Sequence, residues 1–285
     1  MNQQTESENW DLIITPHKKW YDLQLGDLWR YRDLIALFVR RDFVSRFKQT
    51  ILGPLWYIIQ PLFTSIVFTV IFGQIAKLPT DGLPQILFYM SGTVLWHYFS
   101  GCLNGTANTF VSNAGIFGKV YFPRLVTPIS LVISNLISFA IQFLFFLGFL
   151  VYFVLNGAEV RLTSWALTLP LMVIIMAGLG LGVGIIVSSV TTKYRDLSYL
   201  VGFGVSLWMY ATPVIYPVST IPERWRWLAD VNPMTPIIET FRAGFLGAGD
   251  GSWRGLAYSA GFMLVILFIG IVIFNRVEKT FIDTV

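Results

Sequence analysis

Apolar residues form six long runs along this chain that contain no Asp, Glu, Lys or Arg. Each run is at least 21 residues long, and they cover residues 49–76, 82–118, 125–158, 162–192, 197–222 and 255–275. A helix needs about 20 apolar residues to cross a membrane. The pattern therefore predicts an all-α integral membrane protein with six transmembrane helices, near residues 55–76, 85–103, 130–155, 164–190, 199–217 and 256–274.

The segment before the first run has a different pattern, in which basic and apolar residues alternate. Phe43, Val44 and Phe47 are spaced as on one face of a helix. The cations between and beside them are Arg40, Arg41, Arg46 and Lys48. This pattern predicts an N-terminal amphipathic helix in the membrane interface, where anionic headgroups attract the cations. The Gly-Pro pair at residues 53–54 then breaks the helix, and the chain enters the membrane.

The distribution of Lys and Arg predicts the orientation of the six spans. An even number of spans places both termini on one side, and the segments on that side carry fourteen Lys and Arg against six on the other. The positive-inside rule therefore predicts cytoplasmic termini. We divide the chain into a cytoplasmic segment with the interface helix, a transmembrane domain and a cytoplasmic tail, at residues 1–54, 55–275 and 276–285.

The last external loop, residues 218–255, is long and only half polar. Within it, residues 236–246 have the composition of a short amphipathic helix that is too short to span a membrane. Trp225 and Trp227 precede this segment and suit the headgroup level. We predict short re-entrant or interfacial helices here, and a plain folded external loop is the alternative.

The composition agrees with a membrane protein. The chain is 55% hydrophobic and 13% charged, with a mean hydropathy of +0.64. Its single cysteine, Cys102, excludes an internal disulfide. Most basic residues lie close to membrane segments rather than in a basic domain, so we expect no nucleic-acid partner. We also expect no signal peptide and no soluble second domain.

Groups suited to ion coupling or catalysis are scarce. Every formally charged residue falls outside the predicted spans, and His97 is the one histidine within them, for which hydrogen-bonded packing or pore lining is the better interpretation. Ion-coupled transport thus has few groups to use, although sodium held by backbone carbonyls would escape this argument.

No enzyme motif is found either. The sequence lacks His-Glu-x-x-His and Cys/His metal spacing, and Gly118-Lys119 is followed by Val120 rather than by the Ser or Thr of a phosphate-binding loop. We predict a transport subunit without catalytic residues, metal or cofactor of its own. Any nucleotide would be hydrolysed by another polypeptide.

Two further patterns lie inside the predicted spans. Residues 178, 180, 182 and 184 are glycines that form two overlapping Gly-x-x-x-Gly pairs; helix packing is the expected reason, and dimer formation is the alternative. Aromatic residues are frequent in spans one, two and five. They suit lipid-facing and interfacial positions, or a channel lining that stacks on sugar rings. The candidates for that lining are Trp56, Tyr57, Tyr89, Trp96, Tyr98, Phe99, Trp208, Tyr210 and Tyr216.

Several segments, taken in order, resemble the membrane subunits of ABC-2-type polysaccharide exporters, which move O-antigen, capsule or teichoic-acid chains. The resemblance covers nearly the whole chain from about residue 30. It rests on Leu52-Gly53-Pro54-Leu55-Trp56 with Pro61, Phe117-Gly118-Lys119-Val120-Tyr121-Phe122-Pro123-Arg124, Lys193-Tyr194-Arg195-Asp196-Leu197, Thr212-Pro213-Val214-Ile215-Tyr216 and Asn232-Pro233-Met234-Thr235. Each segment alone is weak, but their order together with six spans is specific.

The resemblance implies partners and roles. In such exporters two copies of this subunit form the pathway, and two copies of a separate ATPase, which uses ATP and Mg, bind below. The segment between spans two and three is similar to the coupling helix that contacts the ATPase, which assigns this contact to Asn113, Ala114, Gly115, Ile116, Phe117, Gly118 and Lys119. The interface helix resembles one that also touches the ATPase. Its four cations, at 40, 41, 46 and 48, thereby gain a second role beside headgroup attraction.

The function implied by the resemblance is export of lipid-linked polysaccharide, with O-antigen first among the candidates, across a bacterial inner membrane. An ABC-2 exporter of a drug or small lipid, an ion-driven secondary flippase and a membrane-bound glycan-modifying enzyme are the alternatives. The aromatic enrichment favours polysaccharide over a drug. The scarcity of acids and histidines in the spans disfavours the flippase and the enzyme.

Overall fold

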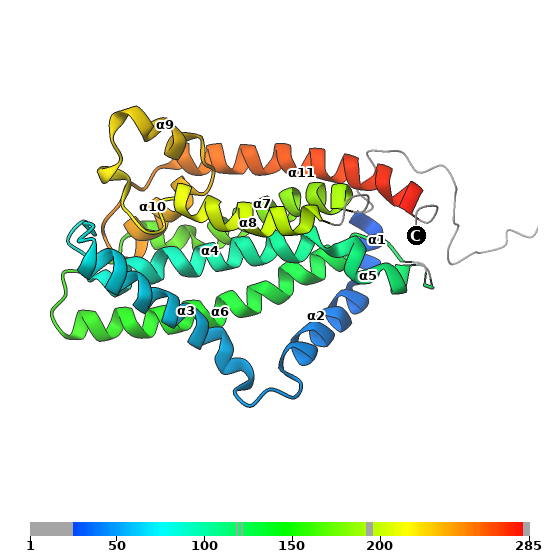
Figure 1. The fold of residues 1–285 in the computed structure, drawn as a ribbon, viewed down its shortest axis with the longest axis horizontal. Helices are drawn as coiled ribbons and strands as arrows, with labels where there is room; N and C mark the ends of the chain where they lie inside the picture. Colours follow the sequence, from blue (N-terminus) through cyan, green and yellow to red (C-terminus); the bar gives the residue numbers. More distant parts are fainter. Residues whose placement is uncertain (1–24, 118, 121, 192–195, 282–285) are drawn as a thin grey trace, which may run out of the picture.

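The computed structural model describes residues 25–117, 119–120, 122–191 and 196–281. Within these residues the regular structure is entirely helical, as the sequence predicts. Figure 1 shows an elongated bundle whose long helices run side by side along one axis. These helices are α3 (Trp56–Phe68), α4 (Gln85–Ala107), α6 (Val126–Leu155), α7 (Leu169–Thr191), α8 (Leu197–Ala211) and α11 (Trp253–Phe281).

The remaining helices lie toward the two ends of this bundle (Figure 1). Toward one end are α1 (Leu25–Arg30), α2 (Arg32–Phe47) and α5 (Thr109–Phe117), and at the other are α9 (Glu223–Val231) and α10 (Thr235–Phe245). Turns of 3-10 helix occupy Gly53–Leu55, Ser164–Thr168 and Val218–Thr220, and a π-helical segment occupies Thr69–Ile75. The start of α1 and the end of α11 lie at the same end of the bundle (Figure 1).

Four helical segments are long and apolar enough to cross a membrane, namely Gly53–Ile75, Val126–Leu155, Ser164–Thr191 and Trp253–Val277. They correspond to the first, third, fourth and sixth predicted spans. The first begins with a turn in which Gly53 has a φ of +50°, a backbone region that favours glycine, and Pro54 follows in the first turn. The helix before it, α2, ends at Phe47, which is earlier than the break predicted at residues 53–54.

The second and fifth predicted spans are helices of the same bundle but do not meet those criteria of length and composition. Helix α4 has 23 residues and carries polar side chains along its length. Helix α8 has 15 residues, a length of about 22 Å. The prediction of a helix as far as residue 217 is wrong, because α8 ends at Ala211. A proline disfavours helical backbone in the preceding residue and donates no amide hydrogen bond, and Pro213 has both effects here.

The glycines of α7 pack this helix against two neighbours in the same chain. Gly178 and Gly182 face α11, whereas Gly180 and Gly184 face α4. A Cβ atom added at Gly184 would lie only 2.6 Å from Cβ of Thr106. The backbones therefore approach as closely as small residues allow. The predicted role in helix packing is confirmed, and both pairs are used within one chain.

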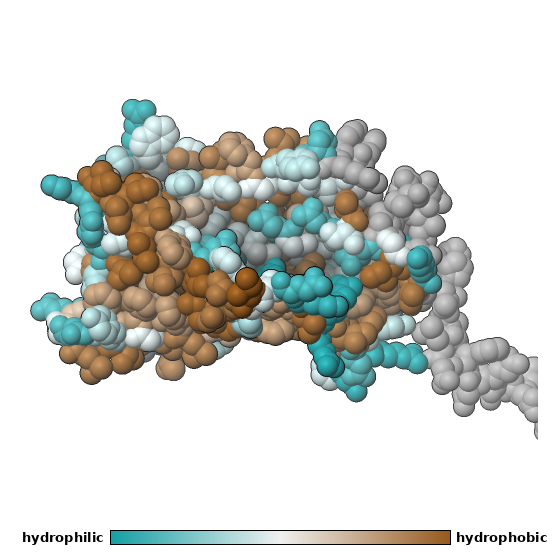
Figure 2. Space-filling view, turned by 60° about the horizontal axis from the view of Figure 1, so that its bottom comes forward, coloured by the Kyte–Doolittle hydropathy of each residue, from teal (hydrophilic) through white to brown (hydrophobic). Residues whose placement is uncertain are grey.

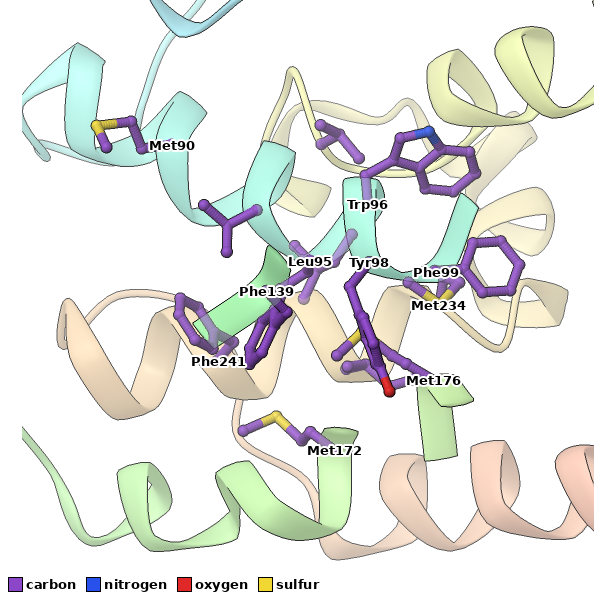
Figure 3. Close-up of a cluster of buried hydrophobic side chains, with 14 of the residues drawn as sticks. Met90, Leu95, Trp96, Tyr98, Phe99, Phe139, Met172, Met176, Met234 and Phe241 are labelled. Carbon is purple, nitrogen blue, oxygen red and sulfur yellow. The ribbon is translucent and has the colours of Figure 1, made fainter. Parts of the chain in front are cut away.

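The main core lies around α4, where large aromatic side chains meet α6, α7 and α8. Figure 3 shows Tyr98 directed toward Phe139 of α6 and Met176 of α7, and the Tyr98 and Phe139 ring centroids are 5.2 Å apart. Trp96 and Phe99 turn to another face of α4 (Figure 3), where both rings contact Trp208 of α8. Helix α4 is thus the central helix of the bundle.

The chain between α8 and α11 contains the predicted short helix as α10, with α9 before it. Arg242 fixes α10 to α4: its side chain is 2% exposed, and it donates hydrogen bonds to the Val214 carbonyl (2.9 Å) and the Ser91 hydroxyl (3.3 Å). The guanidinium also lies 3.7 Å from the Phe88 ring centroid and 3.5 Å from the Glu239 carboxylate. Burial lowers the pKa of Arg242 to about 10, which leaves it charged at neutral pH.

Candidate polar groove of the membrane domain

A hollow of about 550 Å³ opens between α3, α4 and α6 on one side of the bundle. Its walls are largely polar, although α3 and α6 belong to candidate membrane spans. The lining residues are His97, Ser100, Gly101 and Asn104 of α4, Asn135, Ser138 and Gln142 of α6, Trp56, Tyr57, Gln60 and Pro61 of α3, and Arg46 and Phe47 of α2. The hollow gives a polar ligand a place within an apolar bundle.

The polar lining follows the helical repeat. Three polar side chains of α4, at 97, 100 and 104, and three of α6, at 135, 138 and 142, have the same i, i+3, i+7 spacing. Such positions share one face of a helix, so two polar faces line the same hollow. Gly101 permits their close approach, because an added Cβ would lie 2.8 Å from Oδ1 of Asn135.

Two of these polar side chains are buried and only partly satisfied. Ser138 is 7% exposed and Gln142 is 8% exposed. Oγ of Ser138 and Oε1 of Gln142 make no well-formed hydrogen bond with the described residues, although the side chain of Gln142 lies beside His97 and interacts with it. An unpaired buried polar group costs about 1–3 kcal/mol, and lipid offers it no water. Polar groups kept in a membrane bundle in this state are typical of a substrate route.

A second hollow of about 450 Å³ extends the polar surface to α5. It shares Asn104 with the first hollow and is also lined by Asn108, Ser112 and Asn113. Polar side chains therefore continue from the interior of the bundle to its α5 end. We call the two hollows together the polar groove. Within the described residues, no group of three His, Cys, Asp or Glu side chains is placed to hold a metal ion.

Helices α2 and α3 form a V that projects from the bundle and borders the polar groove (Figure 1). At this border Nη1 of Arg46 donates a hydrogen bond of 3.2 Å to the Tyr57 hydroxyl, and the Phe47 ring packs edge-on against Tyr57. Tyr57 is buried while Arg46 is exposed, so a cation remains accessible at the edge of the groove. Figure 2 shows hydrophobic side chains over the α3 side and polar side chains gathered on the α2 side.

The nine aromatic candidates for a sugar-stacking lining do not share one surface. Four of them, Tyr89, Trp96, Tyr98 and Phe99, are at most 3% exposed and belong to the core around α4. Figure 3 shows the last three among other core side chains. Within one chain, these four rings are occupied by packing contacts.

The other five candidates are closer to the surface or to the polar groove. Trp56 and Tyr57 line the groove. Trp208 and Tyr216 are half-buried, and Tyr210 is exposed on α8. The structure thus brings together only the first two of the nine beside the polar side chains described above.

Comparison with known proteins places the fold in a family. The sequence pattern of the ABC-2 type transporter family matches residues 33–246, which include every residue that lines the polar groove. The chain belongs to the ABC-2 type transporter family. The resemblance inferred from its short segments is therefore confirmed.

Several relatives of this ABC-2 chain carry names from polysaccharide export. The O-antigen export system permease protein RfbA of Klebsiella pneumoniae is 28% identical over 250 residues, covering 87% of this chain and 93% of the relative. The RfbA protein of Myxococcus xanthus is 28% identical over 264 residues, covering 91% and 98%. The polysialic acid transport protein KpsM of Escherichia coli is 25% identical over 249 residues, covering 86% and 93%.

In this ABC-2 chain, α5 contains most of the residues predicted to contact an ATPase. Gly115 and Lys119 are exposed, Ile116 is half-buried, Asn113 and Phe117 are buried, Ala114 lies within the helix, and Gly118 lies outside the described residues. Nδ2 of Asn113 donates to the Thr109 carbonyl at 2.9 Å. The exposed positions are open to a partner, and the buried ones hold α5 against the bundle.

Aromatic side chains connect α5 to other helices. The Phe117 ring centroid lies 5.7 Å from that of Phe122, which in turn lies 5.7 Å from that of Phe38 on α2. Phe110 stacks on Phe274 of α11 with a centroid distance of 4.7 Å. A displacement of α5 would therefore reach α2 and α11 through direct contacts.

The four predicted cations of the interface helix are all exposed, but their surroundings differ. Arg41 pairs with Asp42 at 2.8 Å and lies 4.5 Å from the Phe38 ring centroid. Arg46 contacts Tyr57. Arg40 and Lys48 make no side-chain ion pair or hydrogen bond with the described residues. Their roles in headgroup binding and ATPase contact stay predictions.

Two of the family segments have a structural explanation. Nδ2 of Asn232 donates to Oγ1 of Thr212 at 2.8 Å, and Oδ1 of Asn232 accepts from the Met234 amide at 3.0 Å. These bonds fasten the start of α10 to the end of α8. The segment from Lys193 to Arg195 lies outside the described residues.

Sequence reasoning missed most of the polar groove. It singled out His97, Arg46, Trp56, Tyr57 and Asn113, but for other roles than this lining in most cases. It did not single out the neutral polar side chains Gln60, Ser100, Asn104, Asn135, Ser138 and Gln142 as a lining. The signal was present as i, i+3, i+7 spacing in two separate spans. Neutral amides and hydroxyls carry no formal charge, and within an apolar run they do not stand out as a charged residue would.

Proposed function

We propose that this chain is the membrane subunit of an ATP-driven exporter that moves lipid-linked polysaccharide, with O-antigen first among the candidates, from the cytoplasm across the bacterial inner membrane. Two copies form the pathway, and two separate ATPase subunits hydrolyse ATP with Mg. Six spans leave both termini in the cytoplasm. The names of the relatives from Klebsiella pneumoniae, Myxococcus xanthus and Escherichia coli support this substrate class.

The observation that carries the proposal is the polar groove. A polysaccharide presents many hydroxyl groups, each able to donate and accept a hydrogen bond, and amide and hydroxyl side chains match them without fixed charge. Each such bond has a net worth of about 0.5–1.5 kcal/mol. Weak repeated contacts let a polymer enter and leave, as conduction requires. An apolar drug or a lipid chain would leave the exposed amide and hydroxyl groups of the lining without hydrogen-bond partners.

The edge of the groove fits the charged end of such a substrate. Arg46 is exposed beside Tyr57, and a guanidinium binds phosphate oxygens through charge-assisted hydrogen bonds. In this proposal the diphosphate of the lipid carrier first meets Arg46, and the sugars follow along the amide and hydroxyl groups. Motion of α5, driven by the ATPase, reaches α2 through Phe117, Phe122 and Phe38 and changes the width of the groove.

The test replaces the chain in its native cell by a Gln142→Leu, Ser138→Ala double variant. Surface polysaccharide should fall at least about tenfold while lipid-linked glycan accumulates inside, because the groove loses both partly satisfied groups. The control is Gln74→Leu, since Gln74 is exposed on the first span and does not line the groove. Normal surface polysaccharide in the double variant, at equal protein level, would overturn the proposal. Loss of drug or lipid efflux alone would favour the small-molecule alternative.

A further inference from the structure

A second groove, apolar where the first is polar, lies between α2 and α6. Its volume is about 780 Å³. The apolar lining consists of Leu28, Trp29, Ile35, Ala36, Val39 and Phe43 on the α1–α2 side and Ile129, Ile133 and Ile137 on α6. The three isoleucines recur at every fourth position, so they form one stripe of α6 that faces this groove.

Two cations border the apolar groove, Arg32 and Arg40. They are eight residues apart on α2, which corresponds to about 12 Å along the helix. Arg40 has no ion pair or hydrogen bond with the described residues. Arg32 pairs only with the adjacent Asp33, at 3.9 Å between side chains that are 60% and 93% exposed, and surface pairs of this kind contribute about 0–1 kcal/mol. Both guanidinium groups are available to an anion.

The position of the groove matches the boundary between acyl chains and headgroups. Helix α6 belongs to a candidate membrane span, and the groove lies along its first half. Trp29, which is 73% exposed, lies at the rim, and exposed tryptophans are typical of the headgroup level. An apolar stripe, a tryptophan and two exposed cations, of which Arg32 lies 5.7 Å from the Trp29 ring centroid, therefore occur together at one place.

We infer that this groove binds an anionic phospholipid of the bilayer, with one acyl chain along the isoleucine stripe and its phosphate near Arg32 and Arg40. The two guanidinium groups select the lipid by charge, because a zwitterionic headgroup carries a cation that offsets its phosphate. This lipid is a resident of the protein rather than its cargo. The inference does not depend on which substrate the polar groove carries.

The experiment uses the full chain in liposomes of phosphatidylcholine, with a trace of photoreactive phosphatidylglycerol or of photoreactive phosphatidylcholine that carries the same labelled acyl chain. Mass spectrometry locates the crosslinks. We expect phosphatidylglycerol to label residues 129–137 at least about threefold more than phosphatidylcholine does. Arg32→Gln with Arg40→Gln should remove the difference, and Arg226→Gln, an exposed cation of α9, should leave it unchanged.

Equal labelling by the two lipids in the unaltered protein would overturn the inference, and this comparison needs no variant. Labelling of other parts of the chain with none at residues 129–137 by either lipid would also overturn it. A further variant, Ile133→Trp, fills the groove and should reduce labelling by both lipids. Leu144→Trp, about three turns further along α6 and outside the groove lining, is its control.

Discussion

Helix α4 has two faces that differ in packing. We call the face packed closely against α7 the sealed face, and the face that lines the polar groove the open face. Toward α7 its backbone meets Gly180 and Gly184, where an added Cβ would collide with Cys102 or Thr106. Toward α3 and α6 the same helix presents His97, Ser100 and Asn104 to the polar groove. One face of α4 is therefore closely packed against its neighbour, whereas a neighbouring face lines a hollow.

The difference suggests a division of roles between the two faces, in which one stabilises the bundle and the other contacts the substrate. Lipid supplies little hydrophobic drive for helix association, so the sealed face relies on close backbone approach through small residues. The open face looks across the polar groove to α6, where Oγ of Ser138 and Oε1 of Gln142 make no well-formed hydrogen bond with the described residues. We expect changes on the sealed face to affect stability and changes on the open face to affect export.

The largest expected effect comes from Gly184→Leu on the sealed face. The new side chain cannot fit beside Thr106 and the Leu103 carbonyl, and overpacking of this kind costs about 1–3 kcal/mol or more. The protein should lose its monodisperse form in detergent or unfold at least about 5 °C earlier in a thermal scan. Gly202→Leu on α8 is the matched control, because an added Cβ there meets nothing within 4 Å. Equal loss at both positions would refute the distinction.

Arg242→Gln should have the next largest effect on stability. It removes the hydrogen bond to the Val214 carbonyl and leaves Glu239 without its ion pair, and a buried acceptor left without its partner costs about 1–3 kcal/mol. Burial already raises the pKa of Glu239, which Arg242 opposes. A second change, Glu239→Gln, should therefore recover part of the loss in chemical denaturation. A double variant no more stable than Arg242→Gln alone would contradict this role.

On the α6 side of the polar groove, across from the open face of α4, Asn135→Leu should lower export without lowering stability. It replaces a groove amide by an apolar side chain of similar size, so surface polysaccharide should fall several-fold while the thermal midpoint stays within about 2 °C of the original. Surface polysaccharide is measured in cells that carry the variant, and the thermal midpoint is measured on the purified variant. A fall in midpoint as large as that of Gly184→Leu would mean that the groove is a packing interface.

The smallest expected effect is that of Tyr57→Phe at the edge of the groove. The change removes only the hydroxyl that accepts the 3.2 Å hydrogen bond from Arg46. A single neutral partner of an exposed cation contributes about 1 kcal/mol or less, so export should change less than about fivefold. Arg46→Gln, which removes the cation itself, should reduce export more. The reverse order would show that the tyrosine, and not the arginine, meets the substrate.

Much of this arrangement could be predicted from sequence, for physical reasons that particular residues illustrate. Length and apolar composition predicted the four candidate spans, and the Gly-x-x-x-Gly spacing predicted the close packing of α7. The short helix α10 followed from its amphipathic pattern. These features depend on residues near one another in the chain, so local rules suffice.

The polar groove could not be placed in the same way. Asn135 and Ser138 lie on one helix and Ser100 and Asn104 on another, and only the three-dimensional packing shows that their faces meet. The burial of Tyr89 and Phe99 could not be predicted either. By composition alone, an aromatic residue in a membrane span can face lipid, the protein core or a channel equally well. The apolar run continues past residue 211 and so predicted a longer helix, whereas Pro213 ends α8 at Ala211.

The most direct test of the account measures the access of water and of glycan to the groove. Single cysteines at Asn135, Ser138 and lipid-facing Leu144 would be placed in a Cys102→Ala background, since Cys102 is buried and is the chain's single cysteine. A charged thiol reagent should label 135 and 138 at least about tenfold faster than 144, and more slowly in cells that make lipid-linked glycan than in cells that do not. Labelling of all three at one slow rate, or equal rates in both kinds of cell, would contradict a polysaccharide pathway through this groove.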